Sequence, residues 1–439
     1  MRNVDTVISA RWIVPVVPDG VVLTEHSIVV DRGEIVAVLP ASDVAGRFVT
    51  EEFVELGEHV LIPGLVNAHT HAAMTLLRGF ADDLPLVTWL NDHIWPTEGQ
   101  WVDEAFVGDG TRLAVAEMLS GGVTCFNDMY FFPEVAAEVA RDLGMRMVVG
   151  LICIDGANNY SSGAADGITK GLALHDRLPA GGLVTAAFAP HAPYSVSDEP
   201  LRTIAVLSEK LSIPVHIHLN ETVAESPESV GRYGLTPMRR LAALGLVNER
   251  LVAAHMVHLS DDDVELAAQA SAHVVHCPES NLKLGNGFCD VDRLLRNGIN
   301  VGLGTDGPAS NNDLDVLAEL RVAALIAKGL SRDAAVLPAR QALRLATLGG
   351  ARALGLGERI GSVEVGKRAD LTAIRLDALA NHPIYDPISQ VVYTATRQQV
   401  SDVWVDGARR VRGGELVGFD QRELHRSAQS WADKITTNR

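Results

Sequence analysis

The chain has 439 residues, of which 47% are hydrophobic, and a formal net charge of −18 from 37 basic and 55 acidic side chains. This acidic balance opposes binding to nucleic-acid backbones and to anionic lipid surfaces. No apolar run reaches the roughly 18 residues that a membrane helix needs, and the charged first residues do not resemble a signal peptide.

The cysteines predict a reducing environment. None of them forms a CxxC pair, and each lies in or beside an apolar stretch. We therefore expect buried free thiols and a cytoplasmic protein. These cysteines are Cys125, Cys153, Cys277 and Cys289.

The first sixty residues are rich in short β-branched runs. VDTVISARWIVP, SIVVDRGEIVAVLP and FVELGEHVLIP are separated by turn sequences that contain PDG, RG and ELG. Such runs between turn signals are typical of β-strands. Residues 1–60 are therefore predicted to form the first part of a small β domain.

The middle of the chain alternates short apolar runs with longer amphipathic stretches. The alternation predicts a parallel sheet, and about eight units is the count that closes a (β/α)8 TIM barrel, here over residues 61–357. An open doubly wound sheet is the alternative, but its GxGxxG turn is missing. The eight runs occupy residues 60–69, 122–129, 146–153, 184–191, 214–221, 251–258, 272–279 and 300–306.

The end of the chain returns to a β pattern. SVEVGKRADLTAIRL precedes VWVDGARRV, whose DG pair is a strong hairpin signal, and QRELHRSAQSWADKI reads as a final helix. We expect residues 358–439 to pack with residues 1–60 as one small β-sandwich domain, followed by the terminal helix.

Several apolar runs end in metal-binding residue types. His69 and His71 are two apart, so a strand presents both rings on one face. A single buried histidine is more often a satisfied core residue, and His216 with His218 repeats the same spacing. Strand ends of a barrel converge at one mouth, however, which brings His218 and Asp306 to the same point. The set His69, His71, His218 and Asp306 predicts one Zn²⁺, although Fe²⁺ also fits.

Other polar residues follow the same runs. His191 and His255 also end predicted strands. Glu221 lies three residues after His218, where a carboxylate can move protons between a metal-bound water and a substrate. The alternative is an exposed loop glutamate, because two further glutamates follow closely. His276 is interpreted as structural or supporting, and His93 as a weak candidate for lining the pocket.

Taken together, these residues and their surrounding motifs resemble the amidohydrolase superfamily and, within it, the 5-methylthioadenosine/S-adenosylhomocysteine deaminase family. The resemblance runs from about residue 55 to 375. It rests on PGLVNAHTHAAMTLLRG, DMYFFPE, APHAPYSVSDE, HIHLNET, AAHMVHLS, CPESNLKLGNGFCDV, GTDGPASNNDLD and GSVEVGKRADL.

The resemblance implies a hydrolase with one zinc, because His191 stands where dinuclear relatives have a bridging lysine. It implies attack of a metal-activated water on C6 of an adenine nucleoside, with release of ammonia. Glu221 would protonate ring N1, His255 would stabilise the attacking oxygen, and Asp306 would take the water proton. Glu98 would hold the ribose hydroxyls, and the implied substrate-binding residues are Glu98, His191, Glu221 and Asp306.

The sequence departs from the family in one respect. Some members meet the homocysteine carboxylate with an arginine between the third and fourth strands, but here that stretch offers only Lys170 and Arg177, neither of which aligns. An unpaired buried carboxylate is costly, which favours 5′-methylthioadenosine over S-adenosylhomocysteine. Adenosine and 5′-deoxyadenosine are further candidates.

Two other functions stay open. One is hydrolysis of another N-heterocycle, such as guanine, cytosine or a triazine, since fold does not fix the substrate. The other is a non-catalytic scaffold, which the retained set of ligands disfavours. We expect a small-molecule partner, no nucleic acid, no membrane, and a homo-oligomer.

Overall fold

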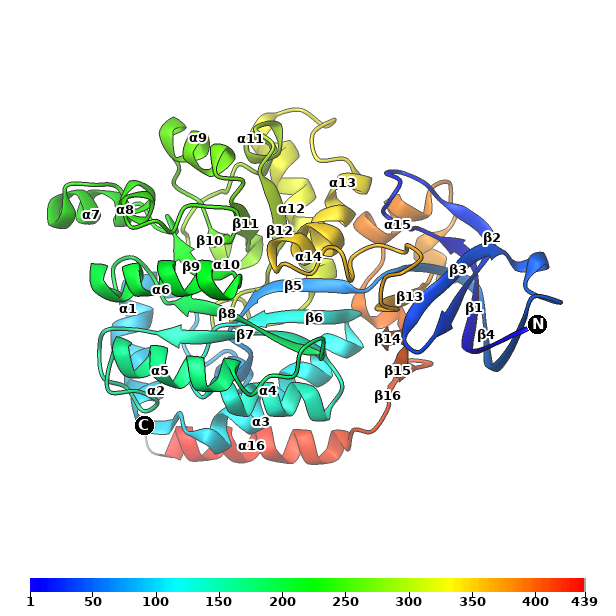
Figure 1. The fold of residues 1–439 in the computed structure, drawn as a ribbon, viewed down its shortest axis with the longest axis horizontal. Helices are drawn as coiled ribbons and strands as arrows, with labels where there is room; N and C mark the ends of the chain where they lie inside the picture. The colour runs from blue at the N-terminus through cyan, green and yellow to red at the C-terminus, as the bar shows by residue number, and fades with distance from the viewer. Residues whose placement is uncertain (438–439) are drawn as a thin grey trace.

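A computed structural model describes residues 1–437 of the chain (Figure 1), which form two eight-stranded sheets, and the barrel sheet is parallel throughout. The strand order follows the sequence, from β5 to β12. A parallel bridge between Thr70 and Asp306 joins the two edges. The predicted barrel is therefore confirmed. Its strands are β5 (Leu65–Thr70), β6 (Val123–Asp128), β7 (Arg146–Cys153), β8 (Val184–Pro190), β9 (Val215–Leu219), β10 (Leu251–His255), β11 (His273–His276) and β12 (Asn300–Leu303).

Helices follow the barrel strands and surround the sheet, as Figure 1 shows. None of the helices within residues 1–437 is long and apolar enough to cross a membrane. The main helices are α3 (Glu104–Ser120), α4 (Pro133–Asp142), α5 (Ala164–His175), α6 (Asp198–Leu211), α7 (Glu225–Tyr233), α8 (Pro237–Ala243), α9 (Asp261–Gln269), α10 (Pro278–Lys283), α11 (Val291–Arg296), α12 (Val316–Ser331), α13 (Ala339–Arg344) and α14 (Gly350–Ala353). The segment after β5 adds η2 (Ala72–Leu77), α1 (Leu86–Thr88), η3 (Trp89–Ile94) and α2 (Trp95–Trp101), and η4 (Leu345–Gly349) precedes α14.

The first predicted barrel strand is divided between two sheets. Residues 60–63 belong to β4 (Phe48–Pro63) of the second sheet, and β5 begins only at Leu65. Gly64 makes the crossing possible, because a Cβ there would lie 2.1 Å from Oγ1 of Thr124. The chain thus enters the barrel through a position that has no room for a side chain.

The second sheet, which is also eight-stranded, confirms that both chain ends build one β unit. Its order is β16-β15-β14-β13-β4-β1-β2-β3, so β13 from the C-terminal part pairs with β4 from the N-terminal part. The predicted DG hairpin joins β14 and β15, with φ of 54° at Asp406 and 80° at Gly407. The strands are β1 (Arg2–Ile13), β2 (Leu23–Asp31), β3 (Glu34–Pro40), β4, β13 (Leu371–Arg375), β14 (Val400–Val405), β15 (Ala408–Arg412) and β16 (Glu415–Leu416).

The helices near the C-terminus pack on the barrel. In α16 (Gln421–Thr437), Nε1 of Trp431 donates to Asp109 of α3 at 2.8 Å, and the ring meets Phe106 edge-on. Figure 1 shows α16 running along the barrel below α3. α15 (Pro387–Tyr393) packs on α12 and α13, and η1 (Ala41–Asp43), η5 (Leu379–Asn381) and η6 (Arg397–Gln399) lie in loops. Of the C-terminal part, only the strands join the second sheet. The domain boundaries at residues 60/61 and 357/358 stay a prediction.

A buried ion pair joins the two sheets. The guanidinium of Arg146, at the start of β7, donates to both carboxylate oxygens of Asp370 at 2.8 and 2.9 Å. The same group contacts Asp406 at 3.0 Å. Both Arg146 and Asp370 have side chains that are 1% exposed, so each charge depends on the other for compensation.

We predict that Arg146→Met lowers the free energy of unfolding by about 3–5 kcal/mol, because it leaves Asp370 buried and uncompensated. Urea denaturation measures this change. Arg141→Met removes an exposed pair with Glu138 and is the control that should leave the midpoint unchanged. The double variant Arg146→Met, Asp370→Leu should regain part of the loss; an equally unstable double variant would contradict the proposed charge compensation.

Candidate metal centre and active site

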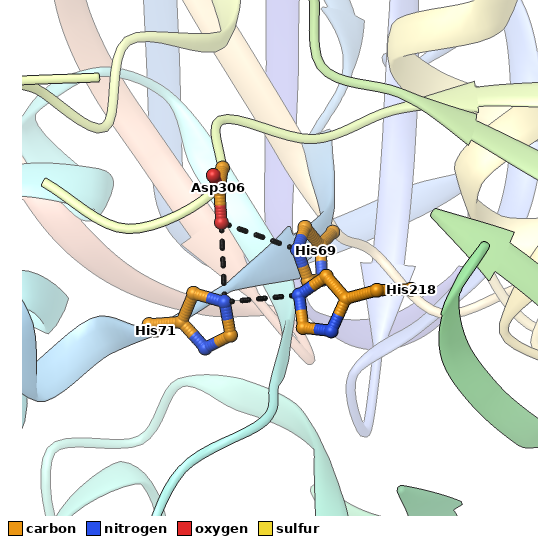
Figure 2. A group of neighbouring side chains, drawn as sticks. All are labelled: His69, His71, His218 and Asp306. Carbon is orange, nitrogen blue, oxygen red and sulfur yellow. Dashed lines mark hydrogen bonds and ion pairs between the residues drawn. The ribbon is translucent and has the colours of Figure 1, made fainter. Parts of the chain in front are cut away.

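Four side chains from the ends of three barrel strands converge on one point (Figure 2). His69 ends β5, His71 follows it, His218 lies in β9, and Asp306 follows β12. Their ligand atoms all lie within 4.8 Å of one another. Oδ1 of Asp306 lies 3.2 Å from Nε2 of His69 and 3.1 Å from Nε2 of His71. Nε2 of His71 lies 3.2 Å from Nε2 of His218, as the dashed lines show.

The outer nitrogens of two of these histidines are already occupied. Nδ1 of His71 donates to the carbonyl of Met129 at 2.6 Å, and Nδ1 of His218 donates to the carbonyl of His191 at 2.7 Å. A carbonyl only accepts, so the proton is on Nδ1 and Nε2 is free for a metal. Nε2 of His69 is buried and makes no hydrogen bond within the described chain. This donor set fits a divalent ion such as zinc.

His216 repeats the spacing but lies beneath the centre. Its Nε2 is 3.0 Å from Nδ1 of His69, and its Nδ1 is 2.7 Å from the amide nitrogen of Asn127. Both of its ring nitrogens are thus used in hydrogen bonds. The second His-x-His pair therefore contributes one converging ligand, His218, and one buried support.

Asp306 is held so that one oxygen faces the centre. Its Oδ2 accepts from Oγ of Ser280 at 2.7 Å and from Oγ of Ser310 at 2.6 Å. Burial opposes ionisation, but the imidazoles of His69 and His71 hold the pKa of Asp306 well below its usual range. Its φ of 62° is in the left-handed region, as is the φ of 73° at His255, and such strain is common at functional sites.

Glu221 and His255 face each other beside the centre. Nε2 of His255 lies 3.9 Å from Oε2 of Glu221. Burial raises the pKa of the Glu221 carboxyl, and the nearby His255 opposes that rise. Burial lowers the pKa of His255, but the carboxylates of Glu221 and Asp306 outweigh it and leave the pKa raised. The two groups therefore influence each other's pKa through their charges.

Glu98 and His191 lie farther out in the same cavity. Oε1 of Glu98 in α2 accepts from the hydroxyl of Tyr130 at 2.7 Å. Desolvation raises the pKa of Glu98 to about 7, although the Tyr130 hydrogen bond opposes the shift. Nδ1 of His191 meets Oγ of Ser195 at 2.8 Å, and burial lowers the pKa of this histidine to about 4.

A cavity at the mouth of the barrel connects these groups. All of the predicted site residues line it except His69, which lies at its base. The other walls are apolar and come largely from the segment after β5. They include Leu86, Trp89, Leu90, Ile94, Trp95 and Ile154.

Three other histidines lie outside the cavity. His93 does not line it, His258 donates to the carbonyl of Asn286 at 2.7 Å, and His276 is buried with neither ring nitrogen hydrogen-bonded to the described residues. Three further residues beside the site, Tyr130, Asn281 and Asn286, were not predicted individually from the sequence. Asn281 contacts His255, and Asn286 contacts Glu221. All three lie in motifs that carry the family resemblance, which is the only signal that marks them.

Known proteins resemble this chain over nearly its whole length. Residues 60–410 match the profile of the Amidohydrolase family. A 5-methylthioadenosine/S-adenosylhomocysteine deaminase of Saccharophagus degradans is 47% identical over 99% of this chain and 98% of its own, and one of Teredinibacter turnerae is 44% identical over 100% and 99%. The crystal structure of an adenosine deaminase from Xanthomonas campestris with bound zinc is 48% identical, covers 99% of both chains and superposes with a TM-score of 0.98.

We predict that His71→Ala removes bound zinc while the barrel stays folded, because one of four converging ligands is lost. Elemental analysis measures the metal, and circular dichroism reports the fold. A chelator should lower the melting temperature of the unaltered protein but not that of the variant. His93→Ala is the matched histidine control and should keep its metal. Full zinc occupancy in His71→Ala would exclude His71 as a ligand.

Proposed function

The chain belongs to the amidohydrolase family, and we propose that it removes the 6-amino group of an adenine nucleoside by metal-dependent hydrolysis. The main support for the proposal is that the predicted site residues share one cavity. Four metal-ligand side chains, the Glu221–His255 pair and the outlying Glu98 all open into one cavity. This arrangement suits attack of water on a ring whose sugar is held at a distance.

We assign the metal to His69, His71, His218 and Asp306, and propose one Zn²⁺. The donor set supports this assignment, as does the buried Nε2 of His69, which makes no hydrogen bond within the described residues and lies 3.2 Å from Oδ1 of Asp306. When bound, zinc supplies a Lewis acid that makes water nucleophilic near neutral pH.

The remaining chemistry belongs to side chains of this protein. Oδ1 of Asp306 faces the centre and is ionised, so it accepts the proton of the attacking water. Glu221 has a raised pKa and holds a proton that it donates to ring N1, which makes C6 more electrophilic. Nε2 of His255 forms a hydrogen bond with the oxygen that attacks C6 and so helps to stabilise the tetrahedral state. A proton then returns to the amino group, and ammonia leaves.

Glu98 and His191 are proposed to bind the nucleoside. The Glu98 carboxylate offers two acceptor oxygens, which match the two hydroxyls of a ribose. His191 lines the same cavity, and its low pKa keeps the ring neutral. A neutral imidazole hydrogen-bonds a purine nitrogen without adding charge.

The cavity walls favour an uncharged 5′-substituent. Among the described residues that line the cavity there is no lysine or arginine. Nζ of Lys170 is bound to the carbonyl of Tyr160 and lies 3.4 Å from Asp166, and Nε of Arg177 donates to the carbonyl of Ala173. We therefore propose 5′-methylthioadenosine as the preferred substrate, because the carboxylate of S-adenosylhomocysteine would find no cation there.

Other heterocycles leave part of the site unused. Guanine, cytosine and triazines have no ribose, so Glu98 would face them without hydroxyls to bind. A scaffold without catalysis gives no reason for a buried cluster of ionisable groups. From the net charge of −18 and the four buried free cysteines we further propose a cytoplasmic enzyme that does not bind nucleic acids. The homo-oligomer stays a prediction.

The decisive experiment measures ammonia release by the zinc-loaded protein. The panel contains 5′-methylthioadenosine, adenosine, 5′-deoxyadenosine, S-adenosylhomocysteine, guanine, cytosine and a triazine. We expect the highest kcat/KM for 5′-methylthioadenosine and a value roughly tenfold or more lower for S-adenosylhomocysteine, whose carboxylate stays unpaired. Equal rates would refute the proposed selectivity. No ammonia from any nucleoside, with zinc bound, would refute the proposed function.

Glu98 also predicts a pH dependence of substrate binding. Its pKa of about 7 means that the carboxylate is protonated below that pH and loses an acceptor, so KM should rise as pH falls through this value. Tyr130→Phe removes a hydrogen bond that favours the charged form, so the rise should begin at higher pH. Steady-state kinetics from about pH 5.5 to 9 measure both effects.

A 2′,3′-dideoxy analogue is the matched control, because it offers Glu98 no hydroxyls. Its KM should not change with the protonation of Glu98. If the analogue showed the same pH profile as the ribonucleoside, the ribose-binding role of Glu98 would be wrong.

A further inference from the structure

One short segment contacts Asp306, Glu221 and His255, the three side chains to which we assign the chemical steps. Ser280 and Asn281 lie in α10, and Asn286 lies in the loop that follows. Ser280 donates to Asp306, as described above. Oδ1 of Asn281 accepts from Nδ1 of His255 at 2.9 Å, and Nδ2 of Asn286 donates to Oε1 of Glu221 at 2.9 Å.

The backbone of this segment is built to aim both amides inward. Asn286 lies between Gly285 and Gly287, whose φ values of 68° and 112° are in the region that favours glycine. The backbone amide of Asn286 donates to the carbonyl of Asn281 at 2.9 Å, so the two positions are tied together. Asn281 is 1% exposed and Asn286 is 8% exposed, which excludes a purely solvent-facing role.

The two asparagine side chains form their hydrogen bonds through different atoms of the amide group. Asn281 uses only its oxygen, since its Nδ2 has no hydrogen-bond partner within residues 1–437. That oxygen keeps the proton of His255 on Nδ1 and turns Nε2 toward Glu221 and the cavity. Asn286 uses its nitrogen and holds one oxygen of Glu221, so that Oε2 is the oxygen that faces His255.

We propose that Asn281 and Asn286 are positioning residues that orient His255 and Glu221 as a pair, and that α10 with its following loop is the element that couples them. The proposal rests on the proposed function, and neither residue touches the metal ligands directly. It also gives the Gly-rich stretch SNLKLGNG a role as the support of the catalytic pair.

The test compares aspartate and leucine at each position in the zinc-loaded enzyme. Aspartate keeps the size and the acceptor of asparagine but loses the donor. At position 281, where the acceptor matters, N281D should keep about tenfold more kcat/KM than N281L, which we expect to lose on the order of 100-fold. At position 286, where the donor matters, N286D should be no better than N286L, because neither side chain has a hydrogen to donate to Oε1 of Glu221.

A role in folding alone would give aspartate the advantage at both positions, because it is the closer match in shape, and that result would overturn the proposal. Thermal unfolding and zinc content are measured for every variant, so that a loss of fold or metal is recognised. Asn297→Asp is the control, since Asn297 is exposed and its side chain bonds only to the carbonyl of Arg293 at 2.8 Å.

Two readouts do not require turnover. Nitrogen NMR of the ¹⁵N-histidine protein should show His255 protonated at Nδ1 in the unaltered protein and in N281D, with that preference lost in N281L. Crystal structures should show Glu221 turned away from the site in N286D. An unchanged tautomer in N281L, or an unmoved Glu221 in N286D, would refute the positioning role even if no nucleoside were a substrate.

Discussion

The mutual compensation of buried ionisable groups at the barrel mouth is the constraint on which the rest of the structure depends. An imidazole or carboxylate removed from water is costly unless another group satisfies it. Here each group has a partner: backbone carbonyls take the outer nitrogens of His71 and His218, and two serine hydroxyls take the outer oxygen of Asp306. The atoms left over point at a common centre, so the same bonds that permit burial also orient the ligands.

These bonds require parts of the chain that are distant in sequence to approach one another closely and in fixed positions. Gly304 lies against His69, where an added Cβ would be 2.7 Å from the Cβ of that residue. Asp306 and His255 leave their strands with left-handed backbone, which costs on the order of 1–3 kcal/mol for each residue. Such strain persists only in a rigid surrounding, and the closed sheet with its packed helices supplies it.

The sequence predicted the parts of the site that follow from strand geometry. Eight apolar runs mark eight strands, and closure places their ends together, so the pattern of the chain alone was enough to group His69, His71, His218 and Asp306. Glu98 could not be found in this way, because it lies on α2 and reaches the cavity through a long excursion after β5; only the family resemblance indicated it. Asn281 and Asn286 were missed because an amide has no characteristic spacing, and its role depends on which atom its neighbour needs.

The metal-ligand residues and the residues of the cavity walls lie on different kinds of element, which explains why only the first group could be predicted from the sequence. The metal-ligand side chains lie on or directly after strands, where register with neighbouring strands fixes them. The apolar walls of the cavity come from α1, η3 and α2, which pack on the barrel but take no part in the sheet. Changes in that segment can alter the size and polarity of the space beyond Glu98 without moving a ligand. The cation-free wall is thus a property of the excursion after β5 and its neighbouring loops.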